Sequence, residues 1–177
     1  VVLSVGHLAE VIETYFGDGA ALGISIDYAR EQHALGTAGA LRHALALTRG
    51  RHILALNGDS YCRVDVARLL QRHVATQAHA TLCVTHVPDS GRYGAVQIDA
   101  RDVIGGFEEK SPNRGAGWIN AGIYLLDREL IAQLPASQTL SIERDVFPTV
   151  GAGKLRAFAA QGPFIDIGTP GSLSPRT

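Results

Sequence analysis

The hydrophobic positions in the first half of the chain follow two alternating spacings. Short apolar or alternating runs, typical of strands, occupy residues 1–5, 24–28, 53–56 and 81–87. Helical spacing of apolar residues occupies residues 7–16, 38–47 and 64–77. This alternation predicts right-handed strand–helix–strand crossovers and a mostly parallel sheet with helices on both faces. The apolar stripes of the helices, such as Val66, Leu69, Leu70 and Val74, are expected to face the core.

The pattern changes after Pro88, where shorter runs are separated by Gly, Asn, Asp and Pro. Strands are predicted at residues 95–98, 103–109, 118–126, 155–160 and 164–167. Short helices are predicted at residues 128–134 and 142–150. Because no internal repeat, linker or low-complexity tract is visible, we expect a single domain over residues 1–177. Its β-rich insertion would lie over the edge of the sheet where ligands bind.

Two apolar strands end in an acidic residue. The run at 53–56 is predicted to be a strand buried on both faces, and it stops at Asn57-Gly58-Asp59; a later run leads into Asp166. Ligands of such sheets bind outside the carboxyl ends of the strands. Two carboxylates that meet there repel unless a cation lies between them, and Mg²⁺ prefers oxygen ligands. The simpler alternative is that each aspartate caps the turn that follows it.

Composition narrows the possible partners. The 177 residues carry a net charge of −1 with a pI of about 6.7, so no overall field favours nucleic acid or an anionic membrane. No apolar run is long enough for a membrane span. Cys62 and Cys83 form neither a CxxC motif nor a disulfide framework, which fits a reducing cytoplasm. Because the chain lacks methionine and opens inside a strand, we expect residues to precede Val1.

Three further segments place glycines beside polar side chains. The run at residues 31–40 joins a strand to a helix, where glycines allow a ligand close to the backbone and the helix N-terminus offers N–H groups. Lys110, at a strand end, is suited to neutralise a phosphate. Residues 92–94 and 120–122 would suit a polyhydroxylated ligand. Ordinary turns, tight hairpins and a solvated charged rim explain the same residues without a ligand.

Other polar residues receive structural assignments. Histidines 7, 43, 73 and 79 fall on or beside predicted helices and are expected at the surface. Ser141 is expected to be the N-cap of a helix whose first turn is acidic. None of these residues is assigned a catalytic role.

Seven segments in this order resemble the sugar-1-phosphate nucleotidyltransferases, especially the mannose-1-phosphate and D-glycero-α-D-manno-heptose-1-phosphate guanylyltransferases. They are LGTAGA, LNGD, RYGAV, FEEK, NAGIY, SIERDVFP and FIDIGTP. The resemblance covers nearly the whole chain. It implies a Rossmann-like three-layer α/β/α fold, a mixed sheet and transfer of a nucleotidyl group from a nucleoside triphosphate to a sugar 1-phosphate. It also implies Mg²⁺ as cofactor and leaves a homo-oligomer open.

The resemblance also implies roles for individual residues. The nucleotide would contact Glu31, Leu35, Gly36, Thr37, Ala38, Asn57 and Gly58. The sugar phosphate would contact Tyr93, Gly94, Glu109, Lys110, Asn120 and Gly122. The catalytic residues would be Asp59, Lys110 and Asp166, with Asp59 and Asp166 holding the metal.

The family pattern also shows departures and alternatives. Family members begin with a strand and a glycine-rich GGxGTRL loop followed by a lysine, and these are not found ahead of the second-strand equivalent at Val1. Three alternatives therefore stay open: thymidylyl or uridylyl transfer to glucose 1-phosphate, a sugar-nucleotide-consuming glycosyltransferase, and a non-catalytic sugar-nucleotide-binding domain. Asn-Gly-Asp at residues 57–59, in place of the Asp-x-Asp common in glycosyltransferases, disfavours the second.

Overall fold

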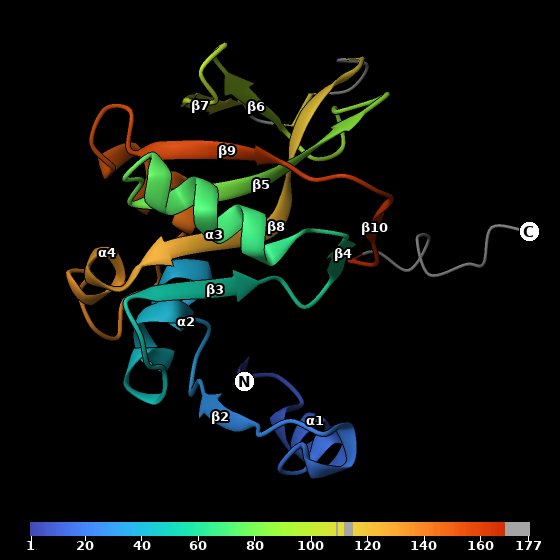
Figure 1. Cartoon of the computed structure of the whole chain (residues 1–177). Coiled ribbons are helices and arrows are strands. Elements are labelled where there is room, and N and C mark those ends of the chain that lie inside the picture. The colour runs from blue at the N-terminus through green and yellow to red at the C-terminus, as the bar shows by residue number, and fades with distance from the viewer. Residues whose placement is uncertain (109, 112–114, 169–177) are drawn as a thin grey trace, which may run out of the picture. The chain divides into compact units, whose positions relative to one another are not determined.

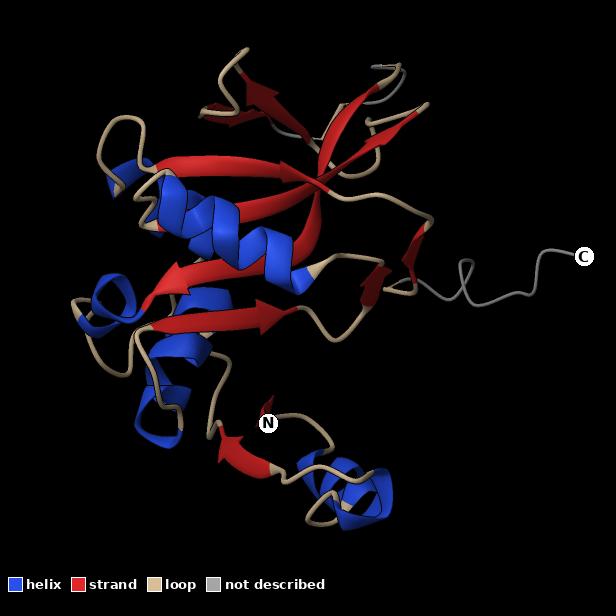
Figure 2. Cartoon of the chain, in the orientation of Figure 1, coloured by secondary structure: helices blue, strands red, loops and turns tan. Residues whose placement is uncertain are grey.

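The computed structural model describes residues 1–108, 110–111 and 115–168. Its helices and strands alternate in the first half of the chain, as the sequence predicts (Figure 2). The chain divides into two compact units: a first unit of residues 1–53 and 127–149, and a second unit of residues 54–126 and the chain from Val150. Within the described residues, no helix has both the length and the apolar character needed to cross a membrane.

The first unit contains one pair of parallel strands with helices around it. Strand β1 (Val2–Val5) pairs in parallel with β2 (Asp27–Arg30). The helical elements are α1 (Ala9–Phe16), η1 (Ala20–Leu22), α2 (Gly36–Ala44), η2 (Leu45–Leu47), α4 (Arg128–Ala132), η3 (Ile142–Val146) and η4 (Phe147–Thr149). Helix α2 packs against β1, β2 and α4. Ser141 caps η3 as predicted: its hydroxyl accepts a hydrogen bond from the Arg144 N–H.

The second unit is built on a mixed sheet with strand order β3-β8-β5-β9. The strands are β3 (His52–Leu56), β5 (Ala80–Val87), β8 (Gly117–Asp127) and β9 (Leu155–Ala159). Strand β5 is antiparallel to β8 and parallel to β9. Helix α3 (Val66–Ala75) lies against β5 and β9 (Figure 1). This helix begins at Asp65, whose carboxylate accepts the Arg68 N–H and so caps the first turn.

Two short antiparallel pairs complete the second unit. Strand β4 (Ser60–Cys62) pairs with β10 (Phe164–Asp166), and β6 (Ala95–Ile98) pairs with β7 (Ile104–Glu108). The β6–β7 hairpin is the β-rich part that the spacing of glycines and polar residues predicts. The β4–β10 pair joins segments more than a hundred positions apart in the sequence, and it positions the candidate site.

The bounds of one strand and the burial of another strand and two helices differ from the sequence-based expectation. The strand expected at residues 24–28 is found at Asp27–Arg30. Strand β3 was expected to be buried on both faces, but only Ile53 is buried. Helix α1 buries no residue, and α3 buries Leu69 and His73 while the rest of its apolar stripe is exposed.

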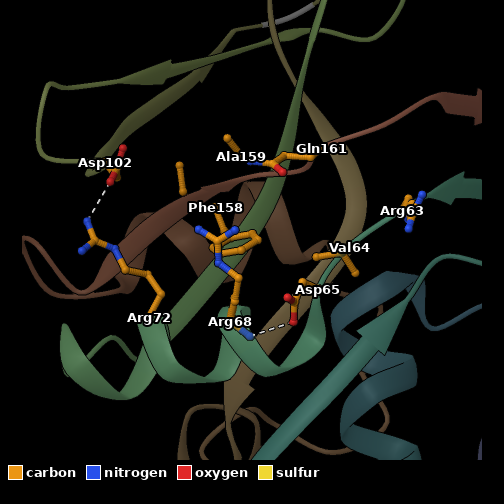
Figure 3. A pocket seen from close by; sticks show the side chains of 10 residues that line it. Arg63, Val64, Asp65, Arg68, Arg72, Asp102, Phe158, Ala159 and Gln161 are labelled. Carbon is orange, nitrogen blue, oxygen red and sulfur yellow. Dashed lines mark hydrogen bonds and ion pairs between the residues drawn. The ribbon is translucent and has the colours of Figure 1, made fainter.

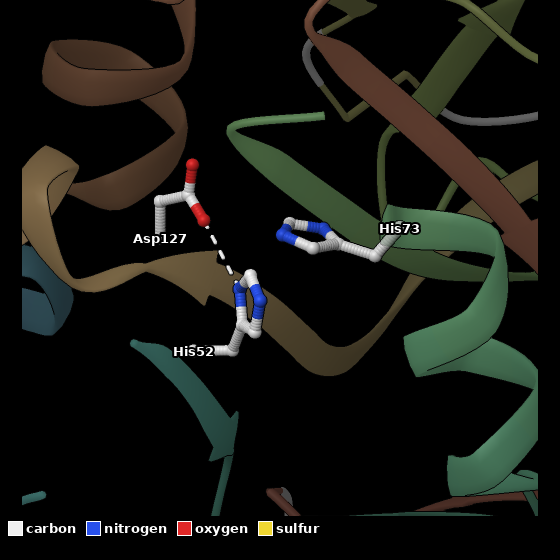
Figure 4. Close-up of side chains that lie close together, drawn as sticks. All are labelled: His52, His73 and Asp127. Carbon is white, nitrogen blue, oxygen red and sulfur yellow. Dashed lines mark ion pairs between the residues drawn. The ribbon is translucent and has the colours of Figure 1, made fainter. Parts of the chain in front are cut away.

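His73 is the one expected surface histidine that proves to be buried, at 1% exposure. Its Nδ1 lies 2.8 Å from the Thr81 hydroxyl, which gives this ring nitrogen a hydrogen-bond partner inside the second unit. In the first unit, His52 Nδ1 lies 3.0 Å from an Asp127 carboxylate oxygen (Figure 4). Each imidazole therefore has a protein partner, which is the structural role that a buried or half-buried histidine most often plays.

The core of the second unit contains both cysteines. Cys62 and Cys83 pack with Leu69, Ala121, Ile123 and Leu125. Both thiols are free, in agreement with the absence of a disulfide framework in the sequence. Burial, with a smaller contribution from Cys62, raises the pKa of the Cys83 thiol to about 12. Cys83 is therefore a neutral thiol at physiological pH, and neither its position nor its charge state suits a nucleophile.

Candidate active site

Asp59 and Asp166 are brought together by the β4–β10 pairing. Asp166 is the last residue of β10 and lies opposite Ser60, the first residue of β4. The Ile167 N–H donates a 2.8 Å hydrogen bond to the Asp59 carbonyl, which extends the pairing to Asp59. Two acids that are far apart in the sequence thus occupy adjacent positions on neighbouring segments.

The carboxylates of both acids converge on Gly168. A β-carbon placed on Gly168 would lie 3.1 Å from Oδ1 of Asp166 and 3.2 Å from Oδ2 of Asp59. Asp166 Oδ1 also accepts the Gly168 N–H at 2.8 Å, so this acid does cap the turn that follows it. Among the described residues, no basic side chain forms an ion pair with either carboxylate. The remaining oxygens can bind a cation.

This oxygen-rich pair fits Mg²⁺. Magnesium in phosphate-transferring enzymes is typically held by one or two carboxylates together with phosphate oxygens and water. Asp59 is exposed and Asp166 is half-buried, so a ligand can approach from solvent. The absence of a neighbouring Arg or Lys partner among the described residues leaves the two negative charges for a metal to balance.

The turn between β3 and β4 is fitted against β8. The Asn57 N–H donates a 2.8 Å hydrogen bond to the Gly122 carbonyl. Gly122 has φ +73°, and a β-carbon there would lie 2.5 Å from Ser60 Oγ and 3.0 Å from Asn57 Nδ2. Only glycine accommodates both this conformation and this contact. By contrast, Gly58 faces open space, where a ligand can reach the backbone.

Asn120 supports the positive-φ conformation of Gly122 in β8. Its Oδ1 accepts the Gly122 N–H at 2.8 Å, and its Nδ2 donates to the Tyr124 hydroxyl at 2.8 Å. The side chain expected to contact a sugar is therefore engaged in holding the positive-φ glycine in place. Its direct contribution to substrate binding stays a prediction.

The remaining sugar-phosphate residues lie around β6, β7 and β10. The Tyr93 ring makes an edge-on contact with Phe164 at a centroid distance of 5.6 Å. Gly94 has φ +83°, and a β-carbon there would lie 2.7 Å from the Glu108 carbonyl. Lys110 is exposed, and its backbone nitrogen is 3.9 Å from that same position. Glu109 lies outside the described residues.

The residues expected to contact the nucleotide base are in the first unit, at the start of α2. The Glu31 carboxylate accepts the Leu35 N–H at 2.9 Å and the Ser4 hydroxyl at 3.2 Å. Thr37 Oγ1 accepts the Ile142 N–H at 2.8 Å. These hydrogen bonds hold the turn before α2 in a defined conformation.

Two further residues of this turn are constrained by Leu140. Gly36 has φ +68°, and a β-carbon there would lie 2.6 Å from the Leu140 carbonyl. The Ala38 N–H donates to the same carbonyl at 2.9 Å, and Leu35 and Ala38 are buried. The expectation that the helix N-terminus offers free N–H groups is therefore wrong for Ala38.

Sequence reasoning missed the short strand β4 and the part played by Ser60. The Ser60 hydroxyl donates to the Ala121 carbonyl at 3.4 Å. Only a partial pattern was available, because Tyr61 is a strand-favouring residue that closely follows a turn. A strand of three residues is too short for such a pattern to stand out from a loop.

Comparison with known proteins assigns the chain to a protein family. A family model described as Nucleotidyl transferase matches residues 1–175. The chain belongs to the nucleotidyl transferase family. This result confirms the resemblance seen in the seven sequence segments.

Curated relatives similar to this nucleotidyl transferase include guanylyltransferases. It is 35% identical over 173 residues to the mannose-1-phosphate guanylyltransferase of Mycobacterium tuberculosis, covering 96% of this chain and 48% of that protein. It is 36% identical over 171 residues to the D-glycero-alpha-D-manno-heptose 1-phosphate guanylyltransferase of Aneurinibacillus thermoaerophilus, covering 96% and 73%. The chain thus spans about half of the first relative and three quarters of the second.

Solved structures support the assignment to the nucleotidyl transferase family. The nucleotidyl transferase aligns with HddC of Yersinia pseudotuberculosis at a TM-score of 0.85 and 28% identity, covering 97% of this chain and 74% of HddC. A second structure of HddC, complexed with GMP-PN, gives the same values. The predicted Rossmann-like α/β fold with a mixed sheet is therefore confirmed.

Proposed function

We propose that this nucleotidyl transferase moves a guanylyl group from GTP to a sugar 1-phosphate of the mannose or heptose type and releases pyrophosphate. The observation that carries the proposal is the convergence of the Asp59 and Asp166 carboxylates on Gly168 in a member of this family. The names of the relatives and the GMP-PN complex of HddC support the choice of base and sugar.

The reaction needs positioning and charge neutralisation more than a protein nucleophile. A phosphate oxygen of the sugar 1-phosphate attacks the α-phosphorus of GTP, and the bond between the α-phosphorus and its bridging oxygen breaks on the opposite side. Pyrophosphate leaves with that electron pair. Because the attacking phosphate oxygen already carries negative charge, no side chain has to remove a proton. The route uses no protein nucleophile, and the buried Cys83 thiol, which stays neutral, would not act as one.

Asp59 and Asp166 would hold Mg²⁺, which supplies positive charge against the phosphate oxygens. The exposed ammonium of Lys110 would neutralise the phosphate of the sugar substrate. Tyr93 and Gly94 would border the sugar. The nucleotide would approach the protein backbone at Gly58, which faces open space. We further propose that the product serves surface polysaccharide or lipopolysaccharide synthesis and that the enzyme works in the cytoplasm.

A substrate panel tests the proposed function. The protein is assayed for pyrophosphate release with GTP, dTTP and UTP, each paired with mannose, heptose and glucose 1-phosphates. We expect turnover that requires Mg²⁺ and is fastest with GTP and a mannose- or heptose-type acceptor. Strong turnover with dTTP or UTP and none with GTP would replace the guanylyl proposal. Sugar-nucleotide binding without turnover of any pair would favour a binding domain.

Replacing Lys110 with alanine is expected to weaken use of the sugar phosphate. The loss of one charge-assisted contact corresponds to about 1.5–3 kcal/mol, or roughly a tenfold to hundredfold rise in KM for the sugar 1-phosphate. The KM for GTP should change little, and K110R should restore part of the loss because it keeps the charge. Steady-state kinetics in both substrates measure the effect. Normal kinetics for the sugar phosphate would show that Lys110 is a solvent-exposed residue without a role in binding this substrate.

A further inference from the structure

The second unit contains a cavity of about 1000 Å³ between α3, β9 and the turn at Asp102 (Figure 3). Its lining includes three arginines, Arg63, Arg68 and Arg72, together with the half-buried ring of Phe158. None of the residues predicted to bind nucleotide, sugar phosphate or metal lines it. The cavity is therefore distinct from the site proposed for nucleotidyl transfer.

The acidic residues of this cavity already have partners. Asp102 pairs with Arg72 at 2.7 Å, as the dashed line in Figure 3 shows. Asp65 accepts the backbone N–H of Arg68 at 3.0 Å and caps α3, so its charge faces the positive end of the helix. Neither acid takes up the guanidinium of Arg68.

Arg63 and Arg68 supply the uncommitted positive charge. Within the described part of the chain, neither guanidinium forms a hydrogen bond or an ion pair. Arg63 follows β4 directly, and Arg68 lies in the first turn of α3, from which it extends toward β9 and Phe158 (Figure 3). Both arginines line the cavity, with Arg68 beside Phe158 and Arg63 apart from them beside β4 (Figure 3).

We propose that this cavity binds the phosphate group of a small molecule at Arg68, with Arg63 adding positive charge to the same lining. Guanidinium groups present paired N–H donors that match phosphate oxygens, and charge-assisted hydrogen bonds are about twice as strong as neutral ones. The cavity volume is in the range of small-molecule sites. Phe158 provides an apolar wall for the organic part of the ligand. A nucleotide and a sugar phosphate share this chemistry.

Binding of inorganic phosphate to the protein in metal-free buffer tests the proposal. Isothermal titration should show one phosphate per chain at this cavity, with affinity that falls as salt is raised. R68Q should weaken binding by about tenfold or more, R63Q should weaken it less, and R68K should lie between R68Q and the wild type. R49Q, which removes an exposed arginine outside the cavity, should bind like the wild type.

Two comparisons complete the experiment. D59N should retain phosphate binding, which separates this cavity from the metal site and from any failure of the proposed function. GMP and mannose 1-phosphate, each competed against inorganic phosphate, identify whether a nucleotide or a sugar phosphate is preferred. Absence of saturable phosphate binding in the wild type, or equal affinity in R63Q, R68Q and R49Q, would overturn the proposal.

Discussion

Replacing Asp59 with asparagine is expected to reduce nucleotidyl transfer by at least about a hundredfold while the protein stays folded. Loss of residues that only support a metal ligand already costs about 10–100-fold, and loss of a ligand should cost at least as much. Asparagine keeps the shape of aspartate but removes the charge that would hold Mg²⁺. Asp59 is exposed and pairs with no basic side chain among the described residues, so stability should not suffer.

Pyrophosphate release and thermal unfolding, measured on the same samples, separate these two effects. D166N should show a similar loss of turnover. D27N, which neutralises an exposed aspartate of β2 in the first unit, is the matched control and should retain wild-type turnover. Unchanged activity of D59N in Mg²⁺ would remove the metal assignment from Asp59.

Replacing Gly122 with alanine is expected to destabilise the protein by about 1–3 kcal/mol, the usual cost of a strained backbone conformation. The φ of +73° disfavours any side chain, and the new β-carbon would lie 2.5 Å from Ser60 Oγ. For a chain of this length the melting temperature should fall by about 2–4 °C for each kcal/mol. Turnover should fall as well, because Asn57 and Ser60 must shift and they flank Asp59.

G105A is the matched control for this substitution. Gly105 lies in β7, and a β-carbon there would meet nothing within 4 Å. Its melting temperature should therefore stay close to that of the wild type. If G122A melted at the same temperature as G105A, the close approach of β8 to the β3–β4 turn would not be a constraint on stability.

Local signals predicted much of the fold because they depend on neighbouring residues alone. The apolar spacing placed β1, α2, α3 and β5 within a few residues of their observed bounds. Ser141 was assignable as an N-cap because capping involves atoms only three residues apart. The expectation of a single domain, and the roles assigned to individual site residues, stay predictions.

Where local signals failed, long-range packing was the cause. His73 has the sequence context of a surface histidine, but Thr81 supplies a partner that makes its burial possible. Strand β3 has the composition of a doubly covered strand, yet it lies at the edge of its sheet and keeps Leu54 and Leu56 exposed. A residue's own neighbours cannot report which elements cover it.

By itself, the sequence determined the alternation of strands and helices, the family resemblance and the presence of an acid at the end of two separate strands. Only the tertiary structure decided that the carboxylates of Asp59 and Asp166 lie beside the same glycine and that Gly122 admits no side chain. It also assembled the arginine-lined cavity from α3 and β9. The physical reason is that side chains distant in sequence meet through strand pairing and packing, whose register no local pattern specifies.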